Sequence, residues 1–449
     1  MKLADALGLG VREVVAITGA GGKTGTLYRL AQECVARGQT VVATTTTHMW
    51  PPNPADGWPL LLGSVPEQRR RIAQVIATEG RAFVAHSVDA SGRLQGIPPA
   101  DVAALAALAD IVLVEADGAR GLWLKAPASH EPAIPPQASL VVSVVGLQAV
   151  GRPLDSAVVH RPERVAEILQ VRLGVPITEE MVAALLTHPQ GALQGVPGGA
   201  RVVPFCNQAE GDSARAAGRR IAARALQAGG PVQRVVVGSL WQGDDACEAW
   251  GQTAAVILAA GEGRRFGRLK QAEVWQGRPL LVRAVDAALA SLATEVRIVL
   301  GCQAESLLPL LAGYDKTRLQ VVTNPGWAEG QASSIRAGLA SLRNTEAAVF
   351  CAADQPLLTA AEIDALLVRH AATGASIVAP SVHGELRSPV LFARRLFPEL
   401  AALQGDIGGR AVIARHRAEV QVVEAADSAP YADIDSEEDL WQLAQKNGC

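Results

Sequence analysis

The sequence lacks the features of secreted, membrane-spanning and nucleic-acid-binding proteins. Its 6 cysteines include no C-x-x-C pair, which argues against a zinc knuckle or a disulfide framework and suits a reducing compartment. The formal net charge is −3 with both signs interspersed, so no basic face is expected for a polynucleotide. The longest apolar stretches, such as 102–114, are interrupted by Asp110 well short of a membrane span, and the first residues show no signal-peptide pattern. We therefore expect a soluble, cytoplasmic protein that binds neither nucleic acid nor membrane.

Apolar sequence is abundant and follows the same plan twice. Of the 449 residues, 49% are hydrophobic, and β-rich runs alternate with helical patterns in two series, each beginning with a strand, a glycine-rich turn and a helix. Such alternation predicts an α/β protein of two doubly wound domains with mostly parallel sheets. We place a P-loop-like domain at residues 1–245, with a small helical insertion at about 150–201, and a Rossmann-like domain at residues 253–449. The polar, glycine-containing segment 238–253 is the predicted linker.

The predicted strands locate the loops in which a site is expected. In the first domain we expect strands at 14–17, 41–44, 111–114, 140–145 and 235–238, with a helix at about 26–37. In the second domain we expect strands at 254–258, 296–300, 348–352 and 377–379. Ligands of open parallel sheets bind beyond the carboxyl ends of the strands. The loops that follow these strands are therefore the candidate binding segments.

The segment 258–270, LAAGEGRRFGRLK, follows the first strand of the second domain. Its glycines, arginines and one lysine present backbone N–H groups together with positive charge, which a triphosphate requires. Lys270 and Arg265 are the candidates for neutralising the phosphates during nucleotidyl transfer. The alternative is that the glycines only permit positive φ in the first turn of a doubly wound domain. The candidate nucleotide-binding residues are Ala259, Ala260, Gly261 and Gly263.

Carboxylates that could bind Mg²⁺ follow later strands of the same domain. Asp354 comes directly after the strand at 348–352, and a capping box at 359–362 starts the next helix. In YADIDSEEDLW, Asp433 and Asp435 alternate with apolar residues, so both should point to one face, where one of them could share Mg²⁺ with Asp354. The alternative for Asp354 is a turn-forming role without metal.

The segment NPGWAEGQASSIRAGL predicts a loop that enters a helix. The free N–H groups at such a helix start form a second anion site or a contact for the acceptor, with Gly330 and Ser333 as the candidate residues. The alternative is that Ser333 or Ser334 only caps the helix.

The first domain carries a shortened phosphate-loop motif. ITGAGGKTGT fits G-x-x-G-K-T at residues 19–24, but the full motif would have glycine where Ile17 stands. The shortened loop still permits backbone amides and Lys23 to hold the phosphates of ATP or GTP, with Thr24 on Mg²⁺. A tight turn with a surface lysine is the alternative. The candidate nucleotide-binding residues are Gly19, Gly21, Gly22, Lys23 and Thr24, and the candidate metal ligands are Thr24, Glu115 and Asp117.

One further segment of the first domain bears on base recognition. Residues 207–210, Asn-Gln-Ala-Glu, resemble a guanine-reading N-K-x-D loop with two substitutions. The two substitutions are Gln208 for lysine and Glu210 for aspartate.

The second domain resembles the molybdenum cofactor cytidylyltransferases, a group of MocA-like NTP transferases, over residues 253–449. The family's motifs N-P-x-W-x-x-G, D-x-P, G-D-x-G-x-R and D-I-D-S-x-x-D are all present. The resemblance implies CTP and molybdopterin as substrates with Mg²⁺, and Ala260, where guanylyl-transferring relatives carry glycine, points to the cytidylyl branch. Arg387 and Ser388 depart from the family's Gly-His/Asn-Pro, which affects pterin recognition and not the reaction class.

The first domain resembles the YqeC-type accessory proteins of selenium-dependent molybdenum hydroxylases over about residues 1–245. The shared segments are GAGGKT, TTTT, EADGARGLWLKAP with HEP, and HPQGALQGVP. The resemblance implies a role in maturing an apo molybdenum hydroxylase, which would be the partner. Two alternatives stay open: a guanylyl or other nucleotidyltransferase, and a chaperone that delivers finished cofactor without catalysing transfer.

Overall fold

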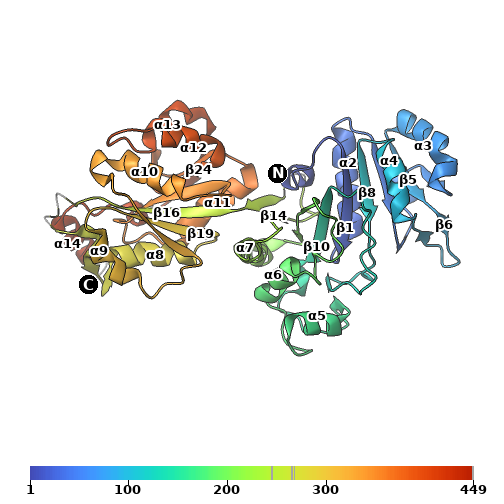
Figure 1. The fold of residues 1–449 in the computed structure, drawn as a ribbon, viewed down its shortest axis with the longest axis horizontal. Helices are drawn as coiled ribbons and strands as arrows, with labels where there is room; N and C mark the ends of the chain where they lie inside the picture. Colours follow the sequence, from blue (N-terminus) through green and yellow to red (C-terminus); the bar gives the residue numbers. More distant parts are fainter. Residues whose placement is uncertain (244–245, 264–265, 267, 447–449) are drawn as a thin grey trace. The chain divides into compact units, whose positions relative to one another are not determined.

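The computed structural model describes residues 1–243, 246–263, 266 and 268–446. The chain divides into two compact units, Met1–Trp250 and Gly251–Cys449, drawn from blue to green and from yellow to red in Figure 1. Each is an α/β unit, as predicted. Among the described helices, none is long and apolar enough to cross a membrane.

The first unit is built on a large sheet with the order β15-β14-β13-β10-β1-β8-β2-β5-β4, and β12 pairs with β10. The pairs of β1 with β10 and β8 are parallel, as are those of β2 with β5 and β8. The strands of this sheet are β1 (Glu13–Gly19), β2 (Val41–Thr45), β4 (Leu60–Leu62), β5 (Arg81–Ala85), β8 (Ile111–Glu115), β10 (Leu140–Gly146), β12 (Arg201–Val202), β13 (Phe205–Asn207), β14 (Arg234–Val237) and β15 (Glu248–Gly251).

Helices cover both faces of this sheet because both faces of its central strands are apolar. In β1, Val15 and Ile17 pack with residues of α1 and α2, whereas Val14 and Ala16 pack with residues of α3 and α4. Alternate residues of a strand point to opposite faces, so continuous apolar strands require two helical layers. The helices are α1 (Leu3–Ala6), α2 (Lys23–Ala36), α3 (Val65–Glu79), α4 (Val102–Ala106), α5 (Pro162–Leu169), α6 (Glu179–Thr187) and α7 (Gly211–Gln227).

The predicted insertion at about 150–201 contains α5 and α6. It also supplies β11 (Val159–His160), which pairs in parallel with β9 (Leu124–Lys125). A second small sheet joins β3 (His48–Met49), β7 (Leu94–Gln95) and β6 (Ser87–Val88). These two-residue strands were not predicted, because they are too short to carry a hydrophobic period.

The predicted linker at 238–253 contains a strand of the first unit. β15 adds to the edge of the sheet next to β14, so this unit extends past residue 245. The buried carboxylate of Glu248 accepts hydrogen bonds from Arg219 at 2.6 and 2.9 Å and from Arg215 at 3.3 Å. These ion pairs with α7 hold the polar segment against the sheet, and hydrophobic patterning does not reveal them.

The second unit has a mixed sheet with the order β20-β19-β16-β21-β24-β22-β23, and β25 pairs with β22. Its first four strands are parallel, but β24 is antiparallel to both β21 and β22. The strands are β16 (Thr253–Ala259), β19 (Glu295–Leu300), β20 (Leu319–Thr323), β21 (Ala347–Ala352), β22 (Ile377–Val382), β23 (Glu385–Leu386), β24 (Val390–Ala393) and β25 (Val420–Glu424), and a hairpin joins β17 (Val274–Trp275) with β18 (Arg278–Pro279).

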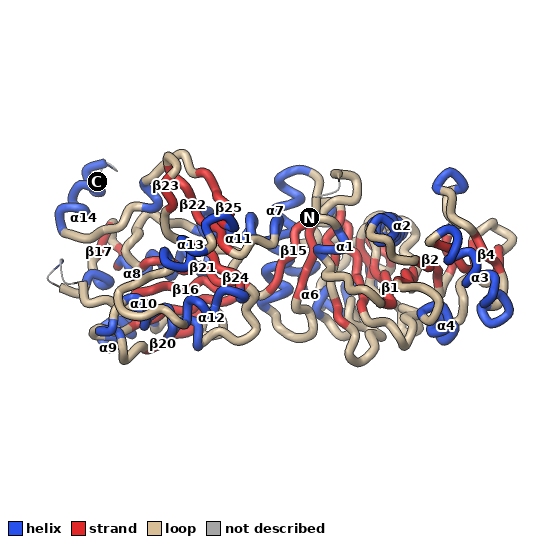
Figure 2. The backbone as a smooth tube through the Cα atoms, turned by 90° about the horizontal axis from the view of Figure 1, so that it is seen from above, coloured by secondary structure: helices blue, strands red, loops and turns tan. Residues whose placement is uncertain are grey.

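Helices lie on both sides of β16 in the second unit, with α8 and α10 on opposite sides (Figure 1). Figure 2 shows the strands of each unit in red among the blue helices. The predicted capping box between Thr359 and Glu362 is present at the start of α11, which confirms that local prediction. The helices are α8 (Leu280–Ala290), α9 (Ala304–Leu307), α10 (Gln331–Ala340), α11 (Ala360–Thr373), α12 (Phe397–Ala401), α13 (Arg410–Arg415) and α14 (Glu437–Lys446).

Candidate functional site

A cavity of about 570 Å³ lies at the carboxyl ends of β16 and β21 in the second unit. The glycine loop after β16 forms one wall, and the start of α10 forms another. Its lining includes six predicted site residues: Ala260, Gly261, Gly263, Lys270, Gly330 and Asp354. Arg265, the other predicted phosphate-neutralising residue, lies outside the described residues.

Lys270 joins two carboxylates that come from distant parts of the sequence. Its Nζ lies 2.8 Å from Oδ2 of Asp354 and 3.2 Å from Oδ1 of Asp435. Asp354 follows β21, and Asp435 precedes α14. Lys270 itself is only 9% exposed, and a buried ammonium requires anionic partners. The structure therefore brings three predicted site residues together.

Asp433 lies near this group but has a different partner. Its Oδ1 accepts a hydrogen bond of 3.0 Å from the side-chain amide of Gln355. Burial, followed by the negative charge of Asp354, raises the pKa of the Asp433 carboxyl. Repulsion between neighbouring carboxylates is relieved by a shared cation.

The carboxylates fit a hard divalent cation such as Mg²⁺. Oδ1 of Asp354 is buried and has no hydrogen-bond partner within the described part of the chain. Oxygen atoms of carboxylates are the preferred protein ligands of Mg²⁺, with water and substrate phosphates completing the shell. No group of three or more acidic, histidine or cysteine side chains in the described residues has the geometry of a metal site by itself. Mg²⁺ would therefore depend on substrate oxygens here.

Gln271 shapes the glycine loop and was missed by the sequence analysis. Its Nε2 donates to the carbonyl oxygens of Gly261 at 2.8 Å and Ala259 at 3.2 Å. Ala259, predicted to bind nucleotide, therefore positions the loop through its carbonyl and does not line the cavity. The role of Gln271 depends on contacts with backbone carbonyls, which no sequence motif reveals.

The start of α10 corrects the interpretation of the two serines. The N-cap is Gly330, whose φ is +102°, and a Cβ atom there would lie 2.6 Å from the Gly405 backbone. Ser333 lies inside the helix, where its Oγ donates to the Gly330 carbonyl at 2.8 Å and accepts from Asn324. The N-cap alternative is therefore wrong for both serines, and Ser334 lines the cavity while Ser333 does not.

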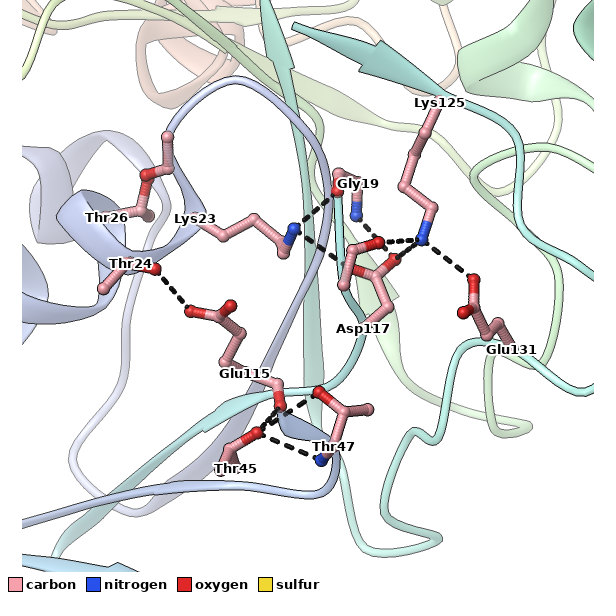
Figure 3. Close-up of polar contacts among 12 residues, drawn as sticks. Gly19, Lys23, Thr24, Thr26, Thr45, Thr47, Glu115, Asp117, Lys125 and Glu131 are labelled. Atoms are coloured by element: carbon pink, nitrogen blue, oxygen red, sulfur yellow. Dashed lines mark hydrogen bonds and ion pairs between the residues drawn. The ribbon is translucent and has the colours of Figure 1, made fainter. Parts of the chain in front are cut away.

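The glycine-rich loop of the first unit links β1 to α2 (Figure 3). Gly21 and Gly22 have φ of +80° and +123°, which side chains disfavour. The amides of Gly19, Ala20 and Gly21 already donate within the protein. Helix α2 begins at Lys23, three residues earlier than predicted, so its first amides, which have no partner inside their helix, are the ones available to a ligand.

Lys23 and Thr24 each contact a carboxylate at the end of β8 (Figure 3). Nζ of Lys23 donates to the Gly19 carbonyl at 2.8 Å and lies 3.2 Å from Oδ1 of Asp117. The Thr24 hydroxyl donates to Oε2 of Glu115 at 2.8 Å. Burial raises the pKa of Glu115, although the charge of Lys23 opposes this. Thr24 and Glu115 thus lie together as a metal-binding pair would, whereas Asp117 is engaged by lysines.

A buried ion cluster continues from Asp117 and was not predicted (Figure 3). Lys125 Nζ lies 3.0 Å from Oδ2 of Asp117 and 3.0 Å from Oε2 of Glu131. Arg161 then binds both oxygens of Glu131, at 2.7 and 2.9 Å. Arg161 directly follows β11 of the helical insertion, and its φ is +65°. The pairing of β11 with β9 is what brings Arg161 to this cluster.

Comparison with known proteins gives one family match within each of the two units. Residues 15–163 match the model of the YqeC protein family, and residues 255–420 match that of the MobA-like NTP transferase domain. "Uncharacterized protein YqeC" of Escherichia coli (strain K12) is 36% identical over 237 residues, which are 51% of this chain and 87% of the relative. "Nicotine blue oxidoreductase" of Paenarthrobacter nicotinovorans is 30% identical over 198 residues, 42% of this chain and 94% of the relative.

Among solved structures, a homologue of Mycobacterium tuberculosis Rv0371c from Mycobacterium sp. strain JC1 is 26% identical with a TM-score of 0.38, over 43% of this chain and 96% of that chain. The chain belongs to the YqeC family through its first unit and to the MobA-like NTP transferases through its second. The predicted membership of the first unit in the YqeC family and of the second unit in the wider group of MobA-like NTP transferases is thereby confirmed.

Proposed function

We propose that the second unit transfers CMP from CTP to molybdopterin, giving the cytosine dinucleotide cofactor and pyrophosphate. The observation that carries this proposal is the Lys270 ammonium between Asp354 and Asp435, beside a cavity walled by a glycine loop. In the reaction, an oxygen of the molybdopterin phosphate attacks the α-phosphorus of CTP. The bond from the α-phosphorus to the bridging oxygen breaks, and pyrophosphate leaves with the bonding electrons.

Residues of this chain supply position and charge for that displacement. The loop at 261–263 offers backbone N–H groups to the phosphates, and Gln271 holds the loop in shape. Lys270 lies within reach of the cavity and would neutralise charge on the transferring and leaving phosphates. Mg²⁺, held by Asp354 and Asp435, would neutralise phosphate charge when bound.

The choice of CTP is supported by Ala260. This residue is buried and lines the cavity, and a Cβ atom built at Gly301 would lie 2.8 Å from the Ala260 methyl group. The methyl group is therefore closely packed against Gly301, and in the wall of the cavity it would narrow the space for a nucleobase. A smaller pyrimidine fits such a constraint better than a purine.

We further propose that the first unit binds ATP or GTP at residues 19–24 and serves the maturation of a selenium-dependent molybdenum hydroxylase. Lys23, Thr24 and Glu115 support nucleotide binding with Mg²⁺. An apo-hydroxylase that receives the cofactor would be the macromolecular partner. One relative of the second unit is named an oxidoreductase, so the proposed transfer of CMP depends on Lys270, Asp354 and Asp435 and not on family membership.

Pyrophosphate release tests the proposal directly. The full chain is incubated with each of ATP, GTP, CTP and UTP, with Mg²⁺ and with or without molybdopterin. We expect release only with CTP and molybdopterin together. Release with GTP in preference to CTP would make the second unit a guanylyltransferase. Tight binding of molybdopterin without release for any nucleotide would instead indicate a cofactor-delivery protein.

A further inference from the structure

The turn after β13, residues 207–210, lies at the same sheet edge as the glycine-rich loop of the first unit. β13 pairs in parallel with β10, and β10 with β1, so the carboxyl ends of these strands meet there. The side-chain nitrogen of Asn207, the last residue of β13, donates to the Gly21 carbonyl at 2.8 Å. A Cβ atom at Gly22 would lie 2.4 Å from that nitrogen. The turn and the loop are therefore packed against each other.

Gly146, the last residue of β10, lies between the turn and the loop. A Cβ atom there would lie 2.4 Å from Oε1 of Gln208 and 3.2 Å from Cα of Gly21. A side chain there would displace Gln208 and crowd Gly21, whereas the bare backbone of glycine permits the close approach of a ligand. The bare backbone at Gly146 could therefore contact the nucleoside of a nucleotide whose phosphates lie on the glycine-rich loop and whose base lies at the turn.

Two buried acceptors in the turn have no hydrogen-bond partner among the described residues. They are Oδ1 of Asn207, a residue that is 1% exposed, and Oε1 of Gln208. Gln208 also has φ of +66°, a left-handed conformation that is uncommon for a residue with a side chain. Burying an unpaired acceptor is unfavourable. The missing donors are therefore expected from a bound molecule with N–H or O–H groups.

Glu210 supplies a carboxylate in the same turn. It is the N-cap residue of α7, yet its side chain makes no capping hydrogen bond. It accepts a short hydrogen bond from the Ser239 hydroxyl instead, and the Trp241 amide donates to the same hydroxyl at 3.1 Å. Ser239 belongs to the loop after β14, so the carboxylate is fixed by a neighbouring strand end while it stays exposed.

We propose that the turn at 207–210 reads the base of a nucleotide whose phosphates lie on residues 19–24, and that this base is guanine. The inference rests on the proposed nucleotide binding of the first unit. Guanine presents N1–H and its 2-amino group as adjacent donors, and the two oxygens of Glu210 can accept both. Adenine presents the lone pair of N1 at that edge, which a carboxylate repels. The turn thus selects guanine over adenine.

Isothermal titration of the full chain with GDP, ADP and XDP in the presence of Mg²⁺ tests this specificity. Lys23→Ala identifies which binding belongs to the first unit, because the second unit also binds nucleotides in the proposal. We expect Lys23-dependent binding of GDP to exceed that of ADP by roughly 10²-fold, as two hydrogen bonds to a charged group imply. Glu210→Gln should favour XDP over GDP, because an amide accepts from xanthine N1–H and donates to its O2. Asp212→Asn, a matched loss of charge two residues away, should leave the preference unchanged.

The outcomes separate the two proposals. Lys23-dependent binding that does not distinguish GDP from ADP would overturn base reading by the turn but leave the phosphate site in place. The same conclusion follows if Glu210→Gln weakens the binding of GDP, ADP and XDP equally. It also follows if Asp212→Asn shifts the preference for GDP as much as Glu210→Gln does. Absence of any Lys23-dependent binding, in a variant and wild type with equal melting temperatures, would overturn nucleotide binding by the first unit altogether.

Discussion

Replacing Glu131 by glutamine tests how strongly the buried ion cluster stabilises the first unit. Burial raises the pKa of Glu131, but the hydrogen bond from Arg161 and the charge of Lys125 outweigh it and lower the pKa from 4.5 to about 2. The side chain is 16% exposed, so solvent screens these contacts only weakly. The lowering corresponds to about 3 kcal/mol of folding free energy at neutral pH.

The sign of this contribution fixes its pH dependence. Because the pKa of Glu131 is lower in the folded state, the contribution is fully present above pH 4.5 and is lost as the pH falls toward about 2. Glu131→Gln should therefore lose about 3 kcal/mol at pH 7 and become nearly as stable as the wild type near pH 2. A glutamine has no charge to lose over this range.

Peptide-resolved hydrogen exchange on the full chain is the appropriate measurement. It follows residues 124–165 without requiring that the two units unfold together, and comparison of variant with wild type at one pH cancels intrinsic exchange rates. Glu163→Gln, an exposed acid at the start of α5, is the matched control and should change little. The quantity compared is the opening free energy of residues 124–165 in Glu131→Gln and in the wild type. A loss below about 1 kcal/mol at pH 7, or a loss that is the same at pH 7 and pH 2.5, would refute the reasoning.

Three further predictions concern the second unit. Lys270→Ala should lower cytidylyl transfer on the order of 10²–10³-fold, while the exposed Lys316→Ala should leave pyrophosphate release unchanged; equal rates for both variants would contradict a role in phosphate neutralisation. Asp354→Asn keeps the side-chain shape but removes a hard anionic ligand, so the Mg²⁺ concentration for half-maximal activity should rise. If the variant responds to Mg²⁺ as the wild type does, Asp354 is only a turn residue. Ala260→Gly should reduce the preference for CTP over GTP in competition assays, and an unchanged ratio would exclude the methyl group as the selective element.

Local chemistry at strand ends was predictable from the sequence. Asp354 and Lys23 follow apolar runs whose length and composition identify buried parallel strands, and parallel strands place such residues at one edge. Gly330 was identified as part of a helix start for a different reason, because its segment was predicted as a loop that enters a helix. The positions of Asp354 and Lys23 could be predicted because the apolar run locates the strand and the polar residues that follow it carry the chemistry.

Contacts that depend on short or antiparallel pairing could not be predicted. Arg161 binds Glu131 because β11 pairs with β9, and two-residue strands carry no periodic signal. Strand β24 enters the second sheet antiparallel between β21 and β22, although the alternation of elements favoured parallel neighbours. Gln271 acts through backbone carbonyls, and such a role leaves no motif in a single sequence.

The two candidate sites share one electrostatic arrangement, and it constrains how each can bind a nucleotide. In both, the lysine is buried and lies beside carboxylates: Lys23 beside Asp117, and Lys270 between Asp354 and Asp435. A buried ammonium without an anion is strongly unfavourable, so these carboxylates offset the cost of burying each lysine and hold its side chain in place before the nucleotide arrives. A phosphate that enters either site must then take over the lysine while the carboxylate gains another cation. Because Mg²⁺ can serve as that cation, nucleotide and metal should bind to each site together more tightly than either binds alone.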